Sequence, residues 1–132
     1  MSDVRVTLAL LAANATLVAS VPFDRIVAGS VPQGTALPAI SVKHVSTKRR
    51  RPVANVASKF CTSRVQITIH AKNYPEQKAV AALVRAALPA TRGVVAGVNV
   101  DSVEHELDGP DTGDDAAGIF QESVDYMIKY NE

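Results

Sequence analysis

The chain has 132 residues, a formal net charge of +1 at pH 7, and 47% hydrophobic and 20% charged residues. This composition excludes a mostly disordered chain, and the lack of an apolar run of roughly 20 residues excludes a transmembrane helix. A single Cys excludes an internal disulfide scaffold. The length predicts one domain over residues 1–132, and 20 Ala and 19 Val against 8 Leu and 6 Ile favour a core built on strands.

The N-terminal segment, residues 1–21, is rich in Ala, Leu and Val. A secretory signal peptide is one interpretation, but Asp3 cancels Arg5 and polar residues interrupt the apolar stretch. We therefore expect an amphipathic helix that is capped by Ser2 and has Asp3 in its first turn. Its predicted apolar stripe consists of Val4, Leu8, Leu11 and Ala15.

Two strands are predicted next. Residues 25–27 indicate a short strand, and residues 39–46 indicate a longer one in which Ile40 and Val42 share a face. Pro and Gly residues punctuate the segment between the two strands, which is typical of a loop.

A very basic segment follows at residues 47–58. It contains the run Lys48-Arg49-Arg50-Arg51, which interrupts the strand pattern. Because the segment is long for a hairpin connection, we expect an exposed basic loop. Residues 60–71 then give the clearest strand, since apolar residues alternate with polar ones from Val65 to Ile69.

Residues 73–88 give the clearest helix. Asn73 is the expected N-cap, Pro75 lies in the first turn, and Glu76 completes a capping box. The predicted core-facing stripe of this helix consists of Val80, Leu83, Val84, Ala87 and Leu88.

Two further strands are expected at residues 95–107 and 119–130. A change in the parity of the apolar residues predicts a β-bulge near Asp101-Ser102. Residues 108–118 are expected to form an acidic hairpin turn that begins with Asp108-Gly109. The order α-β-β-β-α-β-β predicts an α+β domain, with a mainly antiparallel sheet of four to five strands and the N-terminal and central helices on one face.

Charge is strongly segregated along the chain. Seven basic and no acidic residues lie from Lys43 to Arg64, whereas nine acidic residues and no Lys or Arg lie from Asp101 to Asp125. One interpretation is that the two hairpins are neighbours and pair within one subunit, where exposed ion pairs contribute about 0–1 kcal/mol. The other is head-to-tail association, in which the basic loop of one copy meets the acidic edge of the next.

Patterns for catalysis or metal binding are weak. Cys61 with His44, His70 or His105 is a candidate thiol–imidazole pair, but the position of Cys61 at a strand start favours a small buried Cys. The three His have no HExxH or CxxC companion. The acidic turn lacks the alternating ligands and the closing Glu of a calcium loop. We therefore expect no enzyme activity, no metal and no cofactor.

The basic run at residues 48–51 also suits phosphate groups. A nucleic-acid-binding accessory protein that acts through the basic loop is therefore the alternative function, because backbone contacts need only Lys and Arg. A platform for stacking bases is not expected, since no aromatic residue lies between residues 24 and 59.

Several segments together match a known family pattern. The most specific is Pro32-Gln33-Gly34 followed by Leu37-Pro38-Ala39-Ile40, just before a strand. The others are the Leu- and Ala-rich helix that ends near residues 14–18, then Asp24-Arg25-Ile26, the strand 64–71, the helix 74–88 and the closing strand 120–130. Over essentially its full length, the chain resembles the tail completion, or tail terminator, proteins of long-tailed bacteriophages.

This resemblance implies a structural protein of the virion tail that is assembled in the host cytoplasm. It implies a ring, usually a hexamer, at the head-proximal end of the tail tube, which ends tube polymerisation and docks the head-completion proteins. The implied partners are further copies of the chain, the major tail tube protein and the head-completion or stopper protein. Genomic DNA passes through the ring, and neither a membrane nor an enzyme activity is implied.

The charged residues are our own hypothesis for the contacts of such a ring, since they are not part of the family pattern. Segregated charge suits heterologous contacts between copies. A channel that passes DNA should not bind phosphates tightly, so we expect the basic run to face a protein neighbour. The predicted subunit or tail-tube interface comprises Lys48, Arg49, Arg50, Arg51, Lys59, Arg64, Asp101, Glu104, Glu106, Asp108, Asp111, Asp114 and Asp115.

Overall fold

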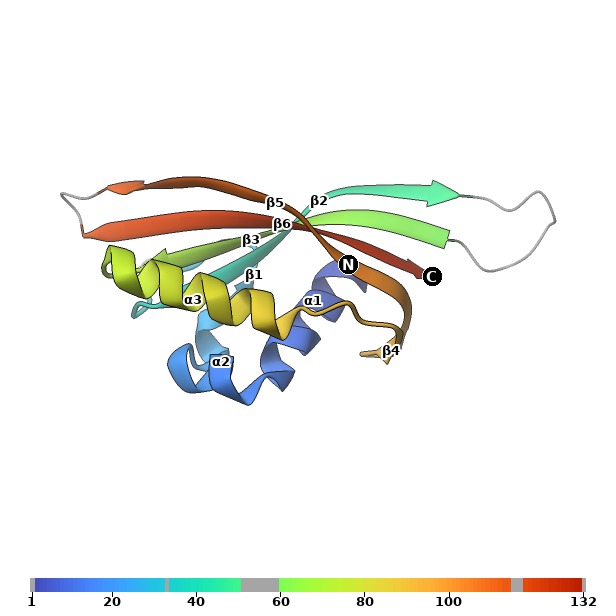
Figure 1. Cartoon of the computed structure of the whole chain (residues 1–132), viewed down its shortest axis with the longest axis horizontal. Helices are drawn as coiled ribbons and strands as arrows, with labels where there is room; N and C mark the ends of the chain where they lie inside the picture. The colour runs from blue at the N-terminus through green and yellow to red at the C-terminus, as the bar shows by residue number, and fades with distance from the viewer. Residues whose placement is uncertain (1, 33, 51–59, 115–117, 132) are drawn as a thin grey trace.

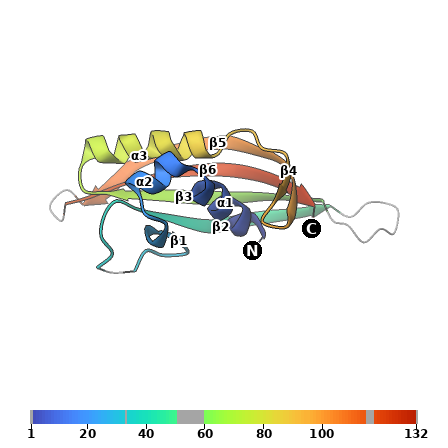
Figure 2. The ribbon, with the colours of Figure 1, turned by 90° about the horizontal axis from the view of Figure 1, so that it is seen from below.

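The computed structural model describes residues 2–32, 34–50, 60–114 and 118–131, and for Asp114 and Ile119 it describes the backbone alone. The elements, in chain order, are α1 (Ser2–Ala13), α2 (Ala15–Ser20), a 3-10 helix η1 (Phe23–Arg25), β1 (Ile26–Ala28), β2 (Ala39–Arg50), β3 (Phe60–Ala71), α3 (Tyr74–Ala87), β4 (Gly93–Val95), β5 (Val98–Asp114) and β6 (Ile119–Asn131). The described strands form one sheet in the order β1-β2-β3-β6-β5-β4. The described helices cover one face of that sheet (Figure 1 and Figure 2).

The α+β class and the two helices on one face are confirmed. The sheet differs from the prediction in two respects, because it has six strands and it is mixed. β1 runs parallel to β2, because the loop between them carries the chain back along the sheet before β2 begins. The predicted strand 95–107 is divided by a two-residue turn, in which Ala96 and Gly97 adopt φ angles of 51° and 80°.

The N-terminal helix divides at Asn14. The side chain of Asn14 accepts a hydrogen bond from the backbone N–H of Leu17 at 3.0 Å and so caps α2. The predicted stripe is therefore wrong at Ala15, which is exposed, and Ser2 lies within α1 instead of capping it. The rest of the stripe packs against the core as predicted: Val4, Leu8 and Leu11.

The hairpin of β2 and β3 is longer than predicted. β2 continues to Arg50, which pairs with Phe60, so residues 47–50 of the predicted basic loop are strand. The reason is the ladder with β3, which supplies partners to the backbone of β2 even though the side chains of residues 48–50 are exposed. The remainder of the predicted loop lies outside the described residues.

Helix α3 has the predicted cap and buried face. Asn73 Oδ1 accepts the N–H of Glu76 at 2.8 Å, and Glu76 Oε1 accepts the N–H of Lys72 at 3.3 Å. The buried face also includes Gln77, which has no exposed surface and was not predicted. The rest of that face follows the prediction: Val80, Val84, Ala87 and Leu88 are buried and Leu83 is half-buried.

The hairpin of β5 and β6 also extends beyond its prediction. β5 runs to Asp114, so Asp108-Gly109 lies inside a strand and the predicted turn 108–118 begins too early. The bulge predicted near Asp101-Ser102 is confirmed by a register shift between Val100 and Ser102. Two more shifts follow, at residues 105–107 and 108–111. Each bulge changes the parity of the side chains, which hides the strand pattern in the sequence.

The central strands β3 and β6 separate a buried face from an open face. Inward side chains of both strands pack beneath the helices, and the fully buried ones include Val65, Ile67, Ile69, Val124 and Ile128. The alternate positions form what we call the open face, the side of the sheet away from the helices. On β3 and β6 these positions are mostly polar, because successive side chains of a strand point to opposite sides.

Candidate assembly interface

The two β-hairpins end at opposite ends of the sheet. Phe60 pairs with Asn131 and Ala71 pairs with Phe120, so β2 ends at one end of the central strands and β5 ends at the other (Figure 1). Figure 2 shows that β2 and β5 also run along opposite sides of the pair β3–β6. The basic and acidic hairpins therefore point away from each other within one chain.

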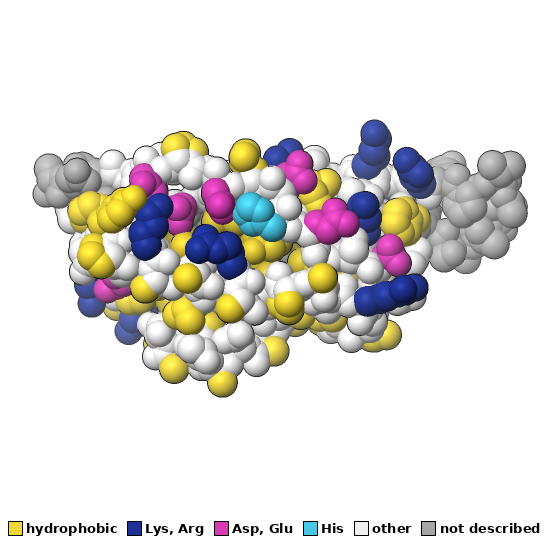
Figure 3. Space-filling view, in the orientation of Figure 1, with side chains coloured by type: hydrophobic (Ala, Val, Ile, Leu, Met, Phe, Trp, Pro, Cys, Tyr) yellow, Lys and Arg dark blue, Asp and Glu magenta, His cyan; other side chains and the backbone are white. Residues whose placement is uncertain are grey.

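Basic side chains gather at the end where β2 stops. Figure 3 shows Lys and Arg side chains at this end of the molecule. Lys48 and Arg50 are exposed on the open face, where they pair with Thr62 and Phe60, whereas the exposed Arg49 pairs with Cys61 and so projects from the other face. Arg64 lies further along β3, where its Nε donates to Asp125 Oδ2 at 3.0 Å. This contact joins the basic stretch to the acidic stretch within one chain. The predicted site residues Arg51 and Lys59 lie outside the described residues.

Acidic side chains line β5. The exposed ones with few internal contacts are Asp101, Glu104, Glu106 and Asp108. Glu104 lies 3.9 Å from Lys129 Nζ, and Asp108 lies 2.9 Å from His105 Nε2 within the same strand. Asp114 is described only as part of the β5 backbone, and Asp115 lies outside the described residues.

Asp111 belongs to a cluster that joins β5 to α3. It accepts hydrogen bonds from the hydroxyl of Tyr74, the amide of Gln77 and Nζ of Lys78, all within 2.9 Å. Lys78 Nζ also donates to the buried carboxylate of Glu122 at 2.8 Å. These hydrogen bonds raise the pKa of Lys78 and lower the pKa of Asp111.

The sequence did not predict this cluster. The residues Gln77 and Lys78 on α3 are far from Asp111 and Glu122 in the chain, and each looks like an ordinary helix-surface or strand residue. The only visible trace was Glu122, which broke the apolar parity of the last strand. The cluster fixes the outer part of β5 against the helix layer.

A second polar contact also escaped prediction. Asp3 of α1 is buried, and its Oδ2 lies 2.5 Å from Nδ1 of His44 on β2. The hydroxyl of Thr7 donates to the backbone carbonyl of Asp3 at 2.8 Å. This contact ties the N-terminal helix to the strand that carries the basic run.

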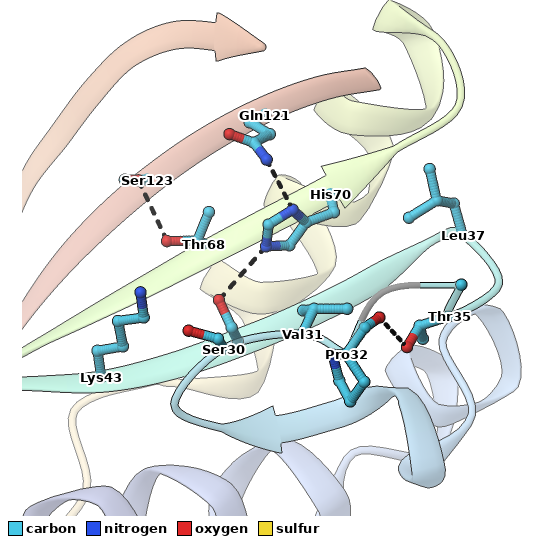
Figure 4. Close-up of a pocket in the computed structure, with 12 residues that line it drawn as sticks. Ser30, Val31, Pro32, Thr35, Leu37, Lys43, Thr68, His70, Gln121 and Ser123 are labelled. Carbon is cyan, nitrogen blue, oxygen red and sulfur yellow. Dashed lines mark hydrogen bonds between the residues drawn. The ribbon is translucent and has the colours of Figure 1, made fainter. Parts of the chain in front are cut away.

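A cavity of about 560 Å³ lies on the open face, between the segment 30–37 and strands β2, β3 and β6 (Figure 4). His70 is at its centre, where Nδ1 accepts a hydrogen bond from Gln121 Nε2 at 3.0 Å and Nε2 lies 3.4 Å from Ser41 Oγ. Burial lowers the pKa of His70, and the charge of Lys43 lowers it further. The cavity thus holds a neutral imidazole among hydroxyl and amide groups.

The candidate catalytic residues are not brought together. Cys61 is fully buried on β3, whereas His44, His70 and His105 make separate contacts on β2, β3 and β5. Among the residues that the structure describes, no group of three or more His, Cys, Asp or Glu is placed to hold a metal ion. None of the described helices is long and apolar enough to cross a membrane.

Comparisons with known proteins matched a family model and solved structures. The model of the family described as "Tail completion protein gp17" matches residues 6–131. Among solved structures, a chain of the virion of a native gene transfer agent (GTA) particle is similar, with a TM-score of 0.68 and 16% identity. That match covers 96% of this chain and 92% of the other chain, and at such low identity it supports the fold alone. No curated protein matched the chain.

Proposed function

Because this chain belongs to the family described as Tail completion protein gp17, we propose that it forms a ring at the head-proximal end of the tail tube. The family and the place in the virion tail are those expected from the sequence. The ring ends polymerisation of the tube and joins the tail to the head-completion proteins. It has a structural role and no catalytic activity.

The observation that supports a ring is the placement of opposite charges on opposite edges. β2 carries Lys48 and Arg50 at one side of the sheet, and β5 carries Glu104 and Glu106 at the other. A contact between unlike surfaces of two identical copies is heterologous, and such contacts close into rings or continue as filaments. Complementary charge fixes the partner and the register of the contact.

The proposed interface is narrower than the set predicted from the sequence. Arg64 and Asp125 neutralise each other in one chain, and Asp111 is held by α3, so we leave Arg64 and Asp111 out of it. Among the residues whose side chains the structure describes, we retain Lys48, Arg49, Arg50, Asp101, Glu104, Glu106 and Asp108; Arg51, Lys59, Asp114 and Asp115 stay in the predicted set. The major tail tube protein and the head-completion protein then contact the two rims of the ring.

The test has two parts. Light scattering of the purified protein, alone and with tail tube protein, should show an oligomer with the mass of a closed ring, a hexamer in the expected case. Particles that lack the protein should carry tails of uncontrolled length when imaged, because the stop to tube growth is lost. Monomers under all conditions, together with tails of normal length, would contradict the proposal.

The alternative function, nucleic-acid binding, is favoured by the exposure of Lys48 and Arg50. It predicts that DNA is retained by the purified protein and released by salt, with a slope set by several phosphate contacts. The ring proposal predicts weak retention, since a channel for DNA must let it slide. Strong, salt-dependent retention that is lost in Lys48→Glu would favour the alternative.

A further inference from the structure

Two edges of the sheet have no neighbouring strand over most of their length, within the part of the chain that is described. β1 pairs only with residues 40–42 of β2, so the outer edge of β2 is open from Lys43 to Arg50. β4 pairs only with residues 98–100 of β5, so the outer edge of β5 is open from Asp101 onward. An open edge presents main-chain N–H and C=O groups that another strand can pair with.

The charges on these edges select the partner. A basic edge repels a second basic edge and an acidic edge repels a second acidic one, so charge disfavours pairing of like with like. The basic edge of β2 and the acidic edge of β5 attract each other. Charged side chains often protect an edge from any pairing, but opposite signs on two edges permit a single combination, head to tail.

The strand directions also fit this combination. β2, β3, β6 and β5 alternate in direction, so β2 and β5 of one chain are antiparallel. In a ring whose axis runs along the strands, β5 of one copy and β2 of the next are therefore antiparallel as well. Across the sheet, one residue each of β2, β3, β6 and β5 pair in a row. Three such rows are Lys48-Thr62-Lys129-Ser102, Ser46-Arg64-Met127-Glu104 and Lys43-Gln66-Asp125-Leu107.

We propose that residues 43–48 of β2 in one copy pair through the main chain with residues 102–107 of β5 in the next copy. This inference rests on the proposed ring and specifies the main-chain contact that joins its subunits. When the rows of two neighbouring copies align, Lys48 of one copy lies beside Ser102 of the next copy and diagonal to its Glu104. All three side chains project from the open face. The sheet is then continuous from one subunit to the next.

Two exposed apolar side chains lie in these segments. Val45 occupies the bulge of β2 and is 50% exposed, and Leu107 on β5 is 53% exposed. In the paired arrangement, Leu107 lies level with Lys43 of the neighbouring copy, next to Val45. Pairing removes part of this apolar surface from water, which favours association.

The outer part of β5 does not take part. Pro110 has no N–H to donate, and the register shifts between Asp108 and Asp111. Asp111 is also held by α3. At the other end of β5, β4 already occupies the edge up to Val100. The segment 102–107 is thus bounded on both sides.

The first test is amide hydrogen exchange on the full chain, with the monomer and the assembled ring compared. Residues 43–48 and 102–107 should gain protection on assembly, whereas the exposed segment around Lys72 should not. A ring that forms without protection of these segments overturns the inference and leaves the proposed function intact. Failure to form a ring even with tail tube protein overturns the proposed function as well.

The second test is a charge exchange. Lys48→Glu alone and Glu104→Lys alone should each weaken association roughly tenfold, since each places like charges side by side. The double variant Lys48→Glu/Glu104→Lys should assemble again, because one copy's new carboxylate meets the next copy's new ammonium. The matched controls Lys72→Glu and Asp24→Lys are exposed changes away from the paired segments and should assemble normally. Failure of the double variant to recover contradicts the proposed register.

Discussion

The two outer edges of the sheet carry opposite charges but differ in how they are held. On the acidic edge, Asp111 is bound by Lys78 and its neighbours on α3, and Lys78 also binds the buried Glu122. On the basic edge, the part of the chain that the structure describes holds no ion pair to Lys48 or Arg50. At Asp111 the acidic edge is therefore held within its own chain, whereas in our proposal the basic edge presents its cations to a neighbouring copy. Changes at Asp111 or Lys78 should therefore cost stability, whereas changes at Lys48 or Arg50, like the change at Glu104, should cost assembly.

The largest effect is expected when the basic edge is reversed. Changing Arg49, Arg50 and Arg51 together to Glu should block tail completion, because each copy then repels the acidic edge of the next. The variant should keep its fold, so that the loss is one of assembly and not of folding. Counts of infectious particles and a urea unfolding curve of the purified variant measure the two outcomes. Normal numbers of infectious particles would argue against the interface.

On the acidic edge, Lys78→Met should lower stability. Glu122 then remains buried without its cation, which costs about 1–3 kcal/mol, with the lower end expected because Lys78 is 42% exposed. Urea unfolding measures the loss. Adding Glu122→Gln should recover part of it, and Lys48→Met on the basic edge should stay within about 0.5 kcal/mol of the unchanged protein. Equal losses for Lys78→Met and Lys48→Met would break the contrast between the edges.

A close backbone approach gives a further test of the acidic edge. A Cβ on Gly109 would lie 2.9 Å from the carbonyl oxygen of Ser123 on β6. Gly109→Ala should therefore destabilise the hairpin by about 1–3 kcal/mol, since the backbone must shift. Thr112→Ala, an exposed change in the same strand, is the control. An unchanged unfolding midpoint for Gly109→Ala would show that β5 is not held this closely.

The smallest expected effect is a pH dependence beside the basic edge. Burial holds the pKa of His70 below its ordinary value of 6.5, so the unfolded chain takes up the proton first as the pH falls. Stability should decrease as the pH falls from 6.5 to the lowered pKa of the folded state and stay level below it. His70→Gln should remove this part of the slope in urea unfolding curves. A slope that persists in the variant would assign it to other groups.

The central elements were predictable because local patterns there coincide with burial. Alternation along β3 and β6 and the cap and stripe of α3 follow from period-2 and period-3.6 patterns. The lengths of β2 and β5 were not predictable. Their outer parts are polar and form strands only because a neighbouring strand supplies hydrogen-bond partners. The three bulges of β5 further removed the alternation.

The candidate site was predictable in composition but not in geometry. Charge counts showed a basic and an acidic stretch, and several of their residues are exposed on β2 and β5: Lys48, Arg49, Arg50, Asp101, Glu104, Glu106 and Asp108. The ion pairs of Asp111 with Lys78 and of Arg64 with Asp125 could not be inferred, nor could the contact of Asp3 with His44. Each joins residues that are distant in the chain. No local pattern records such contacts.

The sequence by itself determined the α+β class, the central strands, the capped helix, the family resemblance and the separation of charge. Only the tertiary structure decided that the two charged strands lie on opposite edges, point to opposite ends and remain open over most of their length. The physical reason is that strand order and register are set by pairing between distant segments. A sequence pattern reports which face of a strand is buried, but not which strand lies beside it.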